Sequence, residues 1–319
     1  MKSLRVTLRP VTAFMTPLHG DTLFGQLCWA LRNRLGDAWL DGALAGYDRG
    51  EPFLVVSDGF PAGYWPRPCL PPLPGSNRDK VAKKQLWVPQ RGWQKPLQEW
   101  LLACCSEQDA FNPAKESKPP LRSLPRTRNS INRMTGTTGE GGFAPYTLEQ
   151  IWFPPENRLE LWLLHDERVK REEIRQALLD VGQGGFGKKA SSGMGHFELS
   201  EDLREESLPA QKGSNAWLSL GFCLPHGGTM DPQRSFYQVF TRFGRHGDQA
   251  ALTGQPFKKP LLLTRAGAVF SPQQFRSRQW IGHGIGGDGQ ISHCMPKTVQ
   301  QGYAPVVGLH VDWELFNHG

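Results

Sequence analysis

The sequence lacks any run of eighteen consecutive apolar residues, and this absence excludes a membrane-spanning helix. Residues 1–11 are basic and alternate between apolar and polar side chains, whereas a secretory signal peptide needs a continuous apolar stretch. The six cysteines are scattered without a C-x-x-C pair, a pattern typical of reduced thiols. We therefore expect a cytoplasmic protein, and 319 residues are enough for two modest domains with hydrophobic cores.

The sequence also lacks the usual signatures of metal and cofactor sites. It contains no cluster of paired carboxylates that would hold catalytic Mg²⁺. His283, His293 and Cys294, with Cys223 as a fourth ligand, fit no standard zinc spacing. The segment 284–289 spells G-x-G-x-x-G, but no strand precedes it and no helical pattern follows it, which favours a hairpin or loop. We expect no metal and no cofactor.

Positive charge is present in excess and is concentrated in one segment. The net charge is +7, and residues 67–133 hold thirteen Lys or Arg against five Asp or Glu, so the remainder of the chain is close to neutral. The same segment is rich in proline and contains Trp87, Trp93 and Trp100. Cations with interleaved aromatic rings are typical of proteins that bind single-stranded nucleic acid. The alternative is a solvated, poorly ordered insertion whose charge serves solubility.

Residues 182–199 form the most informative stretch, because six of them are glycine. Glycines allow left-handed backbone angles and can expose N–H groups in a concave nest. Lys188, Lys189, Ser191 and Ser192 add cationic and hydroxyl donors at the same place. The stretch is suited to a phosphodiester backbone or another polyanion. A flexible glycine-rich connector is the alternative interpretation.

A nucleotide-binding P-loop is disfavoured for this stretch. Residues 182–188 fit G-x-x-x-x-G-K, but Lys189 occupies the place of the Ser or Thr that holds magnesium. The context is also inverted, because a helical pattern over 169–181 precedes the loop and a strand pattern over 195–200 follows it.

Without the insertion at about 58–127, the first 205 residues predict the order strand, helix, strand, strand, helix, strand. This is the split β-α-β-β-α-β plan of ferredoxin-like and RNA-recognition domains. The predicted elements are 4–12, 21–36, 53–57, 150–153 with 159–164, 169–181 and 196–200. Residues 206–319 show several short strand patterns and weak helical periodicity, which predicts a second, less regular α+β domain.

Two further groups of residues are candidates for contacts with RNA. Arg128, Asn132 and Arg133 offer donors for phosphates and base edges, although a turn-rich loop that bonds its own backbone explains them nearly as well. His19 follows the first strand and could act with Lys188 as a metal-independent ribonuclease pair, but one His also makes a good phosphate or base contact, which we favour.

Three stretches together resemble one family: residues 20–25 (GDTLFG), 128–136 and 182–199. They resemble the fourth subunit of the type III-A Csm CRISPR effector complex, a member of the handle-capping branch of the RAMP superfamily. The segments 259–270 and 299–306 are similar to second-domain segments of that family. The loop ending in Ser-Ser-Gly-x-Gly is the most specific element, whereas the 58–127 insertion matches only as a variable region.

The resemblance implies tandem ferredoxin-like (RRM-like) RAMP domains, 1–205 and 206–319, in a non-enzymatic subunit. Such a subunit binds the 5′ repeat-derived handle of the CRISPR RNA. It docks to the large signalling and DNase subunit and to the backbone RAMP subunit. The residues that the resemblance assigns to the RNA path are His19, Asp21, Arg128, Asn132, Arg133, Gly187, Lys188, Lys189, Ser191, Ser192 and Gly193. Part of 67–127 would form a thumb over the RNA. The rival is a RAMP-type endoribonuclease using His19 with Lys188 or Tyr146, and the subtype stays open among type III-A, type III-B and divergent type III or type IV complexes.

Overall fold

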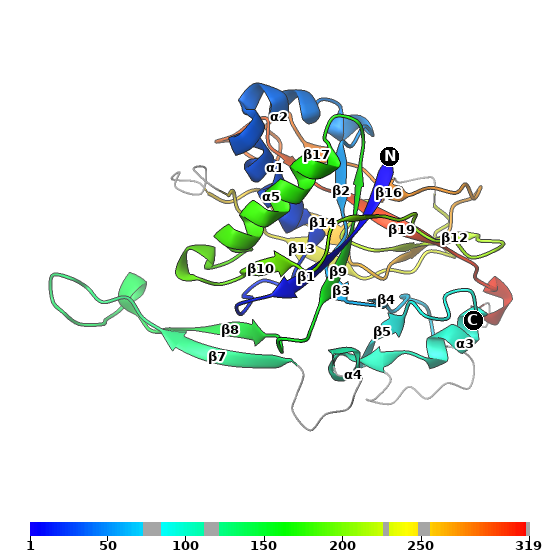
Figure 1. Cartoon of the computed structure of the whole chain (residues 1–319), viewed down its shortest axis with the longest axis horizontal. Helices are drawn as coiled ribbons and strands as arrows, with labels where there is room; N and C mark the ends of the chain where they lie inside the picture. The colour runs from blue at the N-terminus through cyan, green and yellow to red at the C-terminus, as the bar shows by residue number, and fades with distance from the viewer. Residues whose placement is uncertain (73–83, 112–120, 226–229, 248–255, 317–319) are drawn as a thin grey trace.

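The structure is a computed structural model that describes residues 1–72, 84–111, 121–225, 230–247 and 256–316 (Figure 1). Its largest sheet belongs to the N-terminal half and has the antiparallel strand order β10-β1-β9-β2. The elements of this half are β1 (Lys2–Pro10), α1 (Gly20–Leu35), β2 (Leu54–Val56), β9 (Leu159–His165), α5 (Arg171–Gly184) and β10 (Phe197–Leu199). The predicted order of strands and helices in the first half is therefore confirmed.

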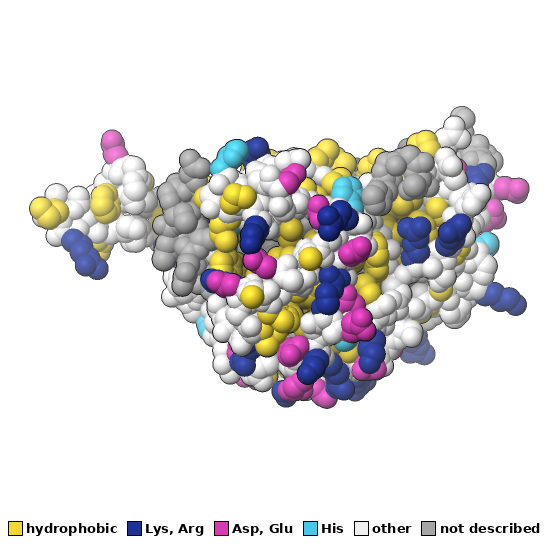
Figure 2. All heavy atoms as spheres, turned by 90° about the horizontal axis from the view of Figure 1, so that it is seen from above, with side chains coloured by type: hydrophobic (Ala, Val, Ile, Leu, Met, Phe, Trp, Pro, Cys, Tyr) yellow, Lys and Arg dark blue, Asp and Glu magenta, His cyan; other side chains and the backbone are white. Residues whose placement is uncertain are grey.

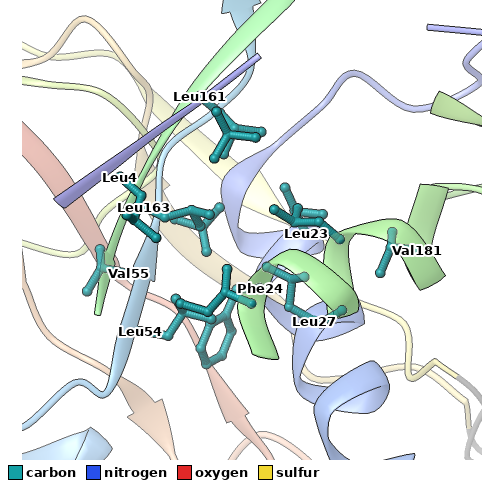
Figure 3. Close-up of a cluster of buried hydrophobic side chains, with 14 of the residues drawn as sticks. Leu4, Leu23, Phe24, Leu27, Leu54, Val55, Leu161, Leu163 and Val181 are labelled. Carbon is teal, nitrogen blue, oxygen red and sulfur yellow. The ribbon is translucent and has the colours of Figure 1, made fainter. Parts of the chain in front are cut away.

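The main core lies between this sheet and the helices α1 and α5. Every second residue of β1 points into it, as the burial of Leu4, Val6 and Leu8 shows. Leu23 and Leu27 of α1, spaced four apart, pack against the sheet from the helix side (Figure 3). Periodicity of two in the strand and of three to four in the helix produces these two matching faces.

Smaller elements complete the N-terminal half. β11 (Arg204–Glu205) pairs with β1, and β3 (Phe60–Pro61) pairs with β9. The short helix α2 (Asp37–Ala43) follows α1 directly, separated from it by Gly36.

The insertion is partly a folded subdomain, which differs from the expectation of an open basic segment. Its described elements are β4 (Tyr64–Pro66), β5 (Gln85–Pro89), α3 (Leu97–Leu102), β6 (Cys105–Ser106) and α4 (Glu107–Phe111). Trp93 and Trp100 are 5% and 1% exposed, and their rings meet edge to face at 4.8 Å. The prediction that these tryptophans stack on bases is wrong, because their rings form a core with Val307 and Leu309.

Part of the predicted basic segment lies outside the described residues. Five of its thirteen cations are outside the described residues: Arg78, Lys80, Lys83, Lys115 and Lys118. The segment continues into a long hairpin of β7 (Arg122–Arg128) and β8 (Tyr146–Trp152), which projects from the body of the molecule (Figure 1). The hairpin joins the body through a bridge between Phe14 and Ile151.

The C-terminal half contains strands and no α-helix among its described residues. Its main sheet has the order β15-β12-β19-β16. The strands of this half are β12 (Ala216–Ser219), β13 (Val239–Arg242), β14 (Leu261–Thr264), β15 (Val269–Phe270), β16 (Trp280–Gly282), β17 (Ile285–Gly286), β18 (Val299–Gln300) and β19 (Tyr303–Leu309). The second two-helix ferredoxin-like plan is therefore not seen there, in line with the weak helical periodicity. The G-x-G-x-x-G segment contributes to the β17–β18 ribbon.

The two halves share buried contacts. The side chain of Gln301 accepts a hydrogen bond from the Val56 N–H at 2.8 Å and donates one to the Val56 carbonyl at 2.8 Å, so it satisfies the backbone at the edge of β2. Tyr303 of β19 lies in the main core. The boundary at 205–206 stays a prediction.

Candidate nucleic-acid interface

The glycine-rich loop leaves the end of α5 at Gly184 and closes on itself at Gly195. Phe186 is fully buried in the main core, and its N–H donates to the Gly195 carbonyl at 2.8 Å. A Cβ at Gly195 would lie 2.1 Å from the carbonyl oxygen of Phe186, and its φ is +75°, so glycine is required there. The loop is thus a defined structure rather than a slack connector.

Backbone N–H groups of the loop are already used inside the protein. Gly187 donates to the Gln26 side chain at 3.2 Å, and Lys188 donates to the Thr16 hydroxyl at 3.1 Å. The N–H groups of residues 192–194 donate to carbonyls within the loop. The expected concave nest of open amides is therefore wrong for these five groups, since each has an acceptor. A ligand can use these five amides only by displacing their acceptors, whereas the polar side chains of the loop are accessible.

Those side chains lie at the surface of the protein. Lys188, Ser191 and Ser192 are exposed, and Gly193 beside them is exposed as well. Lys189 has a left-handed φ of +65°. Its side chain contacts the hairpin, where its Nζ donates to the Tyr146 hydroxyl at 3.0 Å. The ammonium also lies 5.3 Å from the centre of the Tyr146 ring.

This contact joins the loop to the end of the β7–β8 ladder that lies next to the tip loop, and it creates a cationic centre. Arg128 is the cross-strand partner of Tyr146, so it lies at the same level of the ladder. The hydrogen bond from Lys189 lowers the pKa of the Tyr146 phenol. The positive charges of Lys189, Arg128 and Lys188 lower that pKa further, because each favours the phenolate. The structure thus brings together Arg128, Lys188 and Lys189, which the sequence had placed 60 residues apart.

To the predicted Arg128 the hairpin adds Arg122 and Arg126, which the sequence had not singled out. Arg122, Arg126 and Arg128 occupy alternate positions of β7 and therefore share one face with Tyr146. Arg122 and Arg126 are exposed. The even-numbered spacing of these three arginines was the available signal, but the first strand expected after the insertion was 150–153.

Asn132 and Arg133 lie farther out, in the loop at the tip of the hairpin. The Asn132 side-chain oxygen accepts from the Met134 N–H at 2.9 Å, so the turn-forming alternative holds for that oxygen. Met134 is 94% exposed and Ile131 is 59% exposed beside them. Figure 2 shows basic, hydrophobic and acidic side chains on the projecting end.

The His19 side chain contacts Asp58 and Phe222. Its Nδ1 lies 3.3 Å from the Asp58 carboxylate, and its ring lies 4.7 Å from that of Phe222 in the C-terminal half. Asp58 also accepts from the Gly20 N–H at 2.8 Å, so it supplies the cap of α1 that the His19 side chain does not. The structure shows His19 in these contacts rather than against the loop.

Asp21 is buried, with 1% of its side chain exposed, and forms an ion pair with Arg242. Gln300 donates to the same carboxylate at 2.8 Å. The Asp21 carboxylate is thus enclosed by partners inside the protein, and its placement on the RNA path stays a prediction.

Two absences hold within the described part of the chain. No group of three or more His, Cys, Asp or Glu side chains there could hold a metal ion. Nor does any helix of those residues have the length and apolar character needed to cross a membrane. All six cysteines are free thiols, and Cys28, Cys104 and Cys223 are buried.

Comparison with known proteins gives one family. The model of the RAMP superfamily matches residues 11–198, which is more than half of the chain. The fold is similar to that in the Csm3–Csm4 subcomplex of the type III-A CRISPR-Cas interference complex, with a TM-score of 0.60, 12% identity, and coverage of 98% of this chain and 100% of that one. It is also similar to that in the Csm1–Csm4 cassette in complex with pppApA, with a TM-score of 0.57, 16% identity, and coverage of 97% and 98%. A search of curated proteins finds no match.

Proposed function

This chain belongs to the RAMP superfamily, and from that premise we propose that it is a non-catalytic, RNA-anchoring subunit of a type III CRISPR ribonucleoprotein. Its role is to hold the 5′ repeat-derived handle of the CRISPR RNA in the cytoplasm. The observation that carries the proposal is the contact between Lys189 and Tyr146, which unites the loop and the hairpin in one cationic surface.

The electrostatics of this surface suit a phosphodiester backbone. Arg128, Lys188 and Lys189 all lower the pKa of the Tyr146 phenol, and no carboxylate of the described residues contributes to that shift. Cations that are not neutralised by protein carboxylates bind phosphates and release the counterions condensed on the RNA. The exposed hydroxyls of Ser191 and Ser192 add neutral donors beside them. We define the RNA surface as Arg126, Arg128, Tyr146, Lys188, Lys189, Ser191 and Ser192.

The proposed role in assembly is supported by the complexes in which proteins of similar fold occur. One similar structure is a complex of Csm4 with Csm3 and another is a complex of Csm4 with Csm1. We propose that this chain likewise bridges a large signalling subunit and the first backbone subunit. On this proposal the residues of the RNA surface serve positioning, and no bond is made or broken on this chain.

The decisive test is binding to two RNAs of equal length, measured by fluorescence anisotropy. One carries the 5′ repeat handle of the associated CRISPR array and the other carries a scrambled sequence there. Tighter binding of the handle RNA is the expected result. Equal binding would contradict the capping role and leave an RNA binder without sequence preference.

A second candidate, an endoribonuclease that processes the precursor, has one observation in its favour. The pKa of the Tyr146 phenol is lowered by Lys189, as a base for a 2′-hydroxyl would require. Incubation of the purified chain with repeat RNA in EDTA distinguishes the two functions. The non-catalytic role predicts intact RNA, whereas a product with a defined end that disappears in Tyr146→Phe would establish the nuclease.

A further inference from the structure

Trp152, the last residue of β8, has 38% of its surface exposed to solvent. Its ring contacts no other aromatic ring among the described residues. Single exposed apolar side chains are common on protein surfaces, so exposure alone assigns no role to Trp152. The way in which the ring is held, and the side chains that lie beside it, indicate a binding site.

One edge of the Trp152 ring is fixed by a buried amide. The indole Nε1 donates to the Gln150 Oε1 at 3.3 Å, and Gln150 is only 4% exposed. The Gln150 Nε2 in turn donates to the Met194 sulfur of the glycine-rich loop at 3.6 Å. The loop thus orients the amide, and the amide orients the indole. A ring that is already held in place loses little side-chain entropy when a ligand binds to it.

Trp152 shares one face of the hairpin with three arginines. It lies opposite Arg122 in the ladder, and Arg126 and Arg128 follow on the same face at alternate positions of β7. Arg122 and Arg126 are exposed and form no ion pair with the described residues. Glu149 is the one carboxylate of the ladder, and its odd-numbered position places it on the opposite face. The charges on the face of Trp152 are therefore all positive.

A ring and an arginine lie opposite each other at both ends of this ladder. Tyr146 pairs with Arg128 at one end, and Trp152 pairs with Arg122 at the other (Figure 1). Six positions separate the two rings, which corresponds to about 20 Å along the strand. Between them the accessible part of the face follows β7, because Leu124 is 38% exposed whereas the residues of β8 on the same face are buried.

We propose that Trp152 stacks on an unpaired base of single-stranded RNA and that Arg122 binds the phosphate beside that base. The RNA then extends from the cationic centre at Tyr146 along β7 to Trp152, beyond the RNA surface defined above. Cations next to aromatic rings bind the phosphates and the bases of a single strand, and stacking tolerates any base. The continuity of this face with the cationic centre favours RNA over an acidic protein segment. The inference rests on the proposed function in taking RNA as the ligand.

The test compares Trp152→Ala and Trp152→Phe with the wild-type chain in binding to the handle RNA, measured by fluorescence anisotropy. Loss of one stacked base should lower the affinity of Trp152→Ala about fivefold to a hundredfold. Trp152→Phe keeps a ring and should retain most of the affinity. The slope of the logarithm of affinity against the logarithm of salt concentration should not change in either variant, because no phosphate contact is removed. In Arg122→Gln this slope should become shallower by about 0.7.

Two controls separate stacking from a general loss of binding. The handle RNA annealed to its complement has no unpaired base, so the wild type and Trp152→Ala should bind this duplex equally well. Phe243→Ala is the matched control variant, because Phe243 is also an exposed ring, 70% accessible, and lies outside the hairpin. This variant should bind the handle RNA with wild-type affinity.

Three outcomes would overturn the inference. The first is wild-type affinity of Trp152→Ala for the single-stranded RNA, and the second is an equal loss of affinity for the duplex. The third is weaker binding of a protein subunit with unchanged RNA affinity, which would assign the ring to a protein contact. If Trp152→Ala does not fold, ultraviolet crosslinking of the wild-type chain to RNA that contains 5-bromouridine replaces it. A crosslink at residue 152 would support stacking, and crosslinks at other residues only would contradict it.

Failure of this inference and failure of the proposed function give different results. Equal binding of the handle and the scrambled RNA by the wild type would contradict the capping role. A loss of affinity for both RNAs in Trp152→Ala would still support stacking in that case. Conversely, a clear handle preference that Trp152→Ala retains at full affinity would leave the proposed function standing and exclude the stacking role.

Discussion

Asp21 and Arg242 form a buried ion pair although 221 positions separate them in the chain. The Asp21 Oδ2 lies 2.6 Å from the Arg242 Nε, and the two side chains are 1% and 16% exposed. Gln300 donates to the same carboxylate and accepts from the Lys258 ammonium at 2.9 Å. One carboxylate and two cations thus connect the start of α1 to the C-terminal half.

Removing this carboxylate should destabilise the whole protein. Asp21→Ala leaves the Arg242 guanidinium and the Lys258 ammonium inside the protein without their shared counter-charge, and loss of one buried partner costs about 3 kcal/mol or more. The free energy of unfolding in urea measures the effect. Asp180→Ala is the matched control, since its pair with Arg34 is on the surface and is worth about 1 kcal/mol or less. Equal losses in the two variants would contradict a special role for Asp21.

Because of the Lys258 ammonium, the stability of the protein should vary with pH in the alkaline range. Burial lowers its pKa to about 8, although Asp21 opposes the shift. The unfolded chain holds this proton up to a pH near the ordinary lysine value of about 10.4. Between these two values the unfolded state binds more protons, so the contribution of Lys258 makes the protein more stable as pH rises. In Lys258→Met this contribution is absent. From pH 8 to pH 10 the unfolding free energy of the wild type should therefore increase relative to that of Lys258→Met. A difference that stays constant over this range would contradict a lowered pKa of Lys258.

The order of elements in the first half was predictable because it depends on local periodicity. The alternation of β1 and the apolar face of α1 over Leu23 and Leu27 can both be read from neighbouring residues. The boundaries of the glycine-rich loop were predictable for the same reason, since a helix precedes it and a strand follows it.

The contacts across the chain were not predictable from local pattern. Whether Asp21 faces solvent or Arg242 depends on how the two halves pack, and no local pattern encodes that packing. The tryptophans of the insertion illustrate the same limit, because rings that stack on bases and rings that fill a core have the same composition. Whether the Gly187 and Lys188 N–H groups are open to a ligand depends on Gln26 and Thr16, which accept their hydrogen bonds and lie over 160 positions away in the sequence.

Trp100 separates a structural role from an RNA-stacking role for the insertion. Its ring is 1% exposed, and its Nε1 donates to the Pro89 carbonyl at 2.8 Å. Trp100→Ala should lower the free energy of unfolding by about 3 to 5 kcal/mol, the usual cost of an aromatic cavity. RNA affinity measured under conditions where the variant is folded should stay at the wild-type value. A stable variant with weakened RNA binding would instead restore the stacking interpretation.

Reversing two charges of the RNA surface should weaken binding in a way that salt identifies. Lys188→Glu with Lys189→Glu removes two cations from the cluster around Tyr146, and we expect the affinity for the handle RNA to fall about tenfold or more. The slope of the logarithm of affinity against the logarithm of salt concentration should become shallower by about 1.4, since each phosphate contact on a single strand contributes about 0.7. Lys2→Glu with Lys212→Glu changes the net charge equally at two other exposed lysines. If both double variants lose affinity and slope alike, net charge attracts the RNA, and the loop has no particular part in binding it.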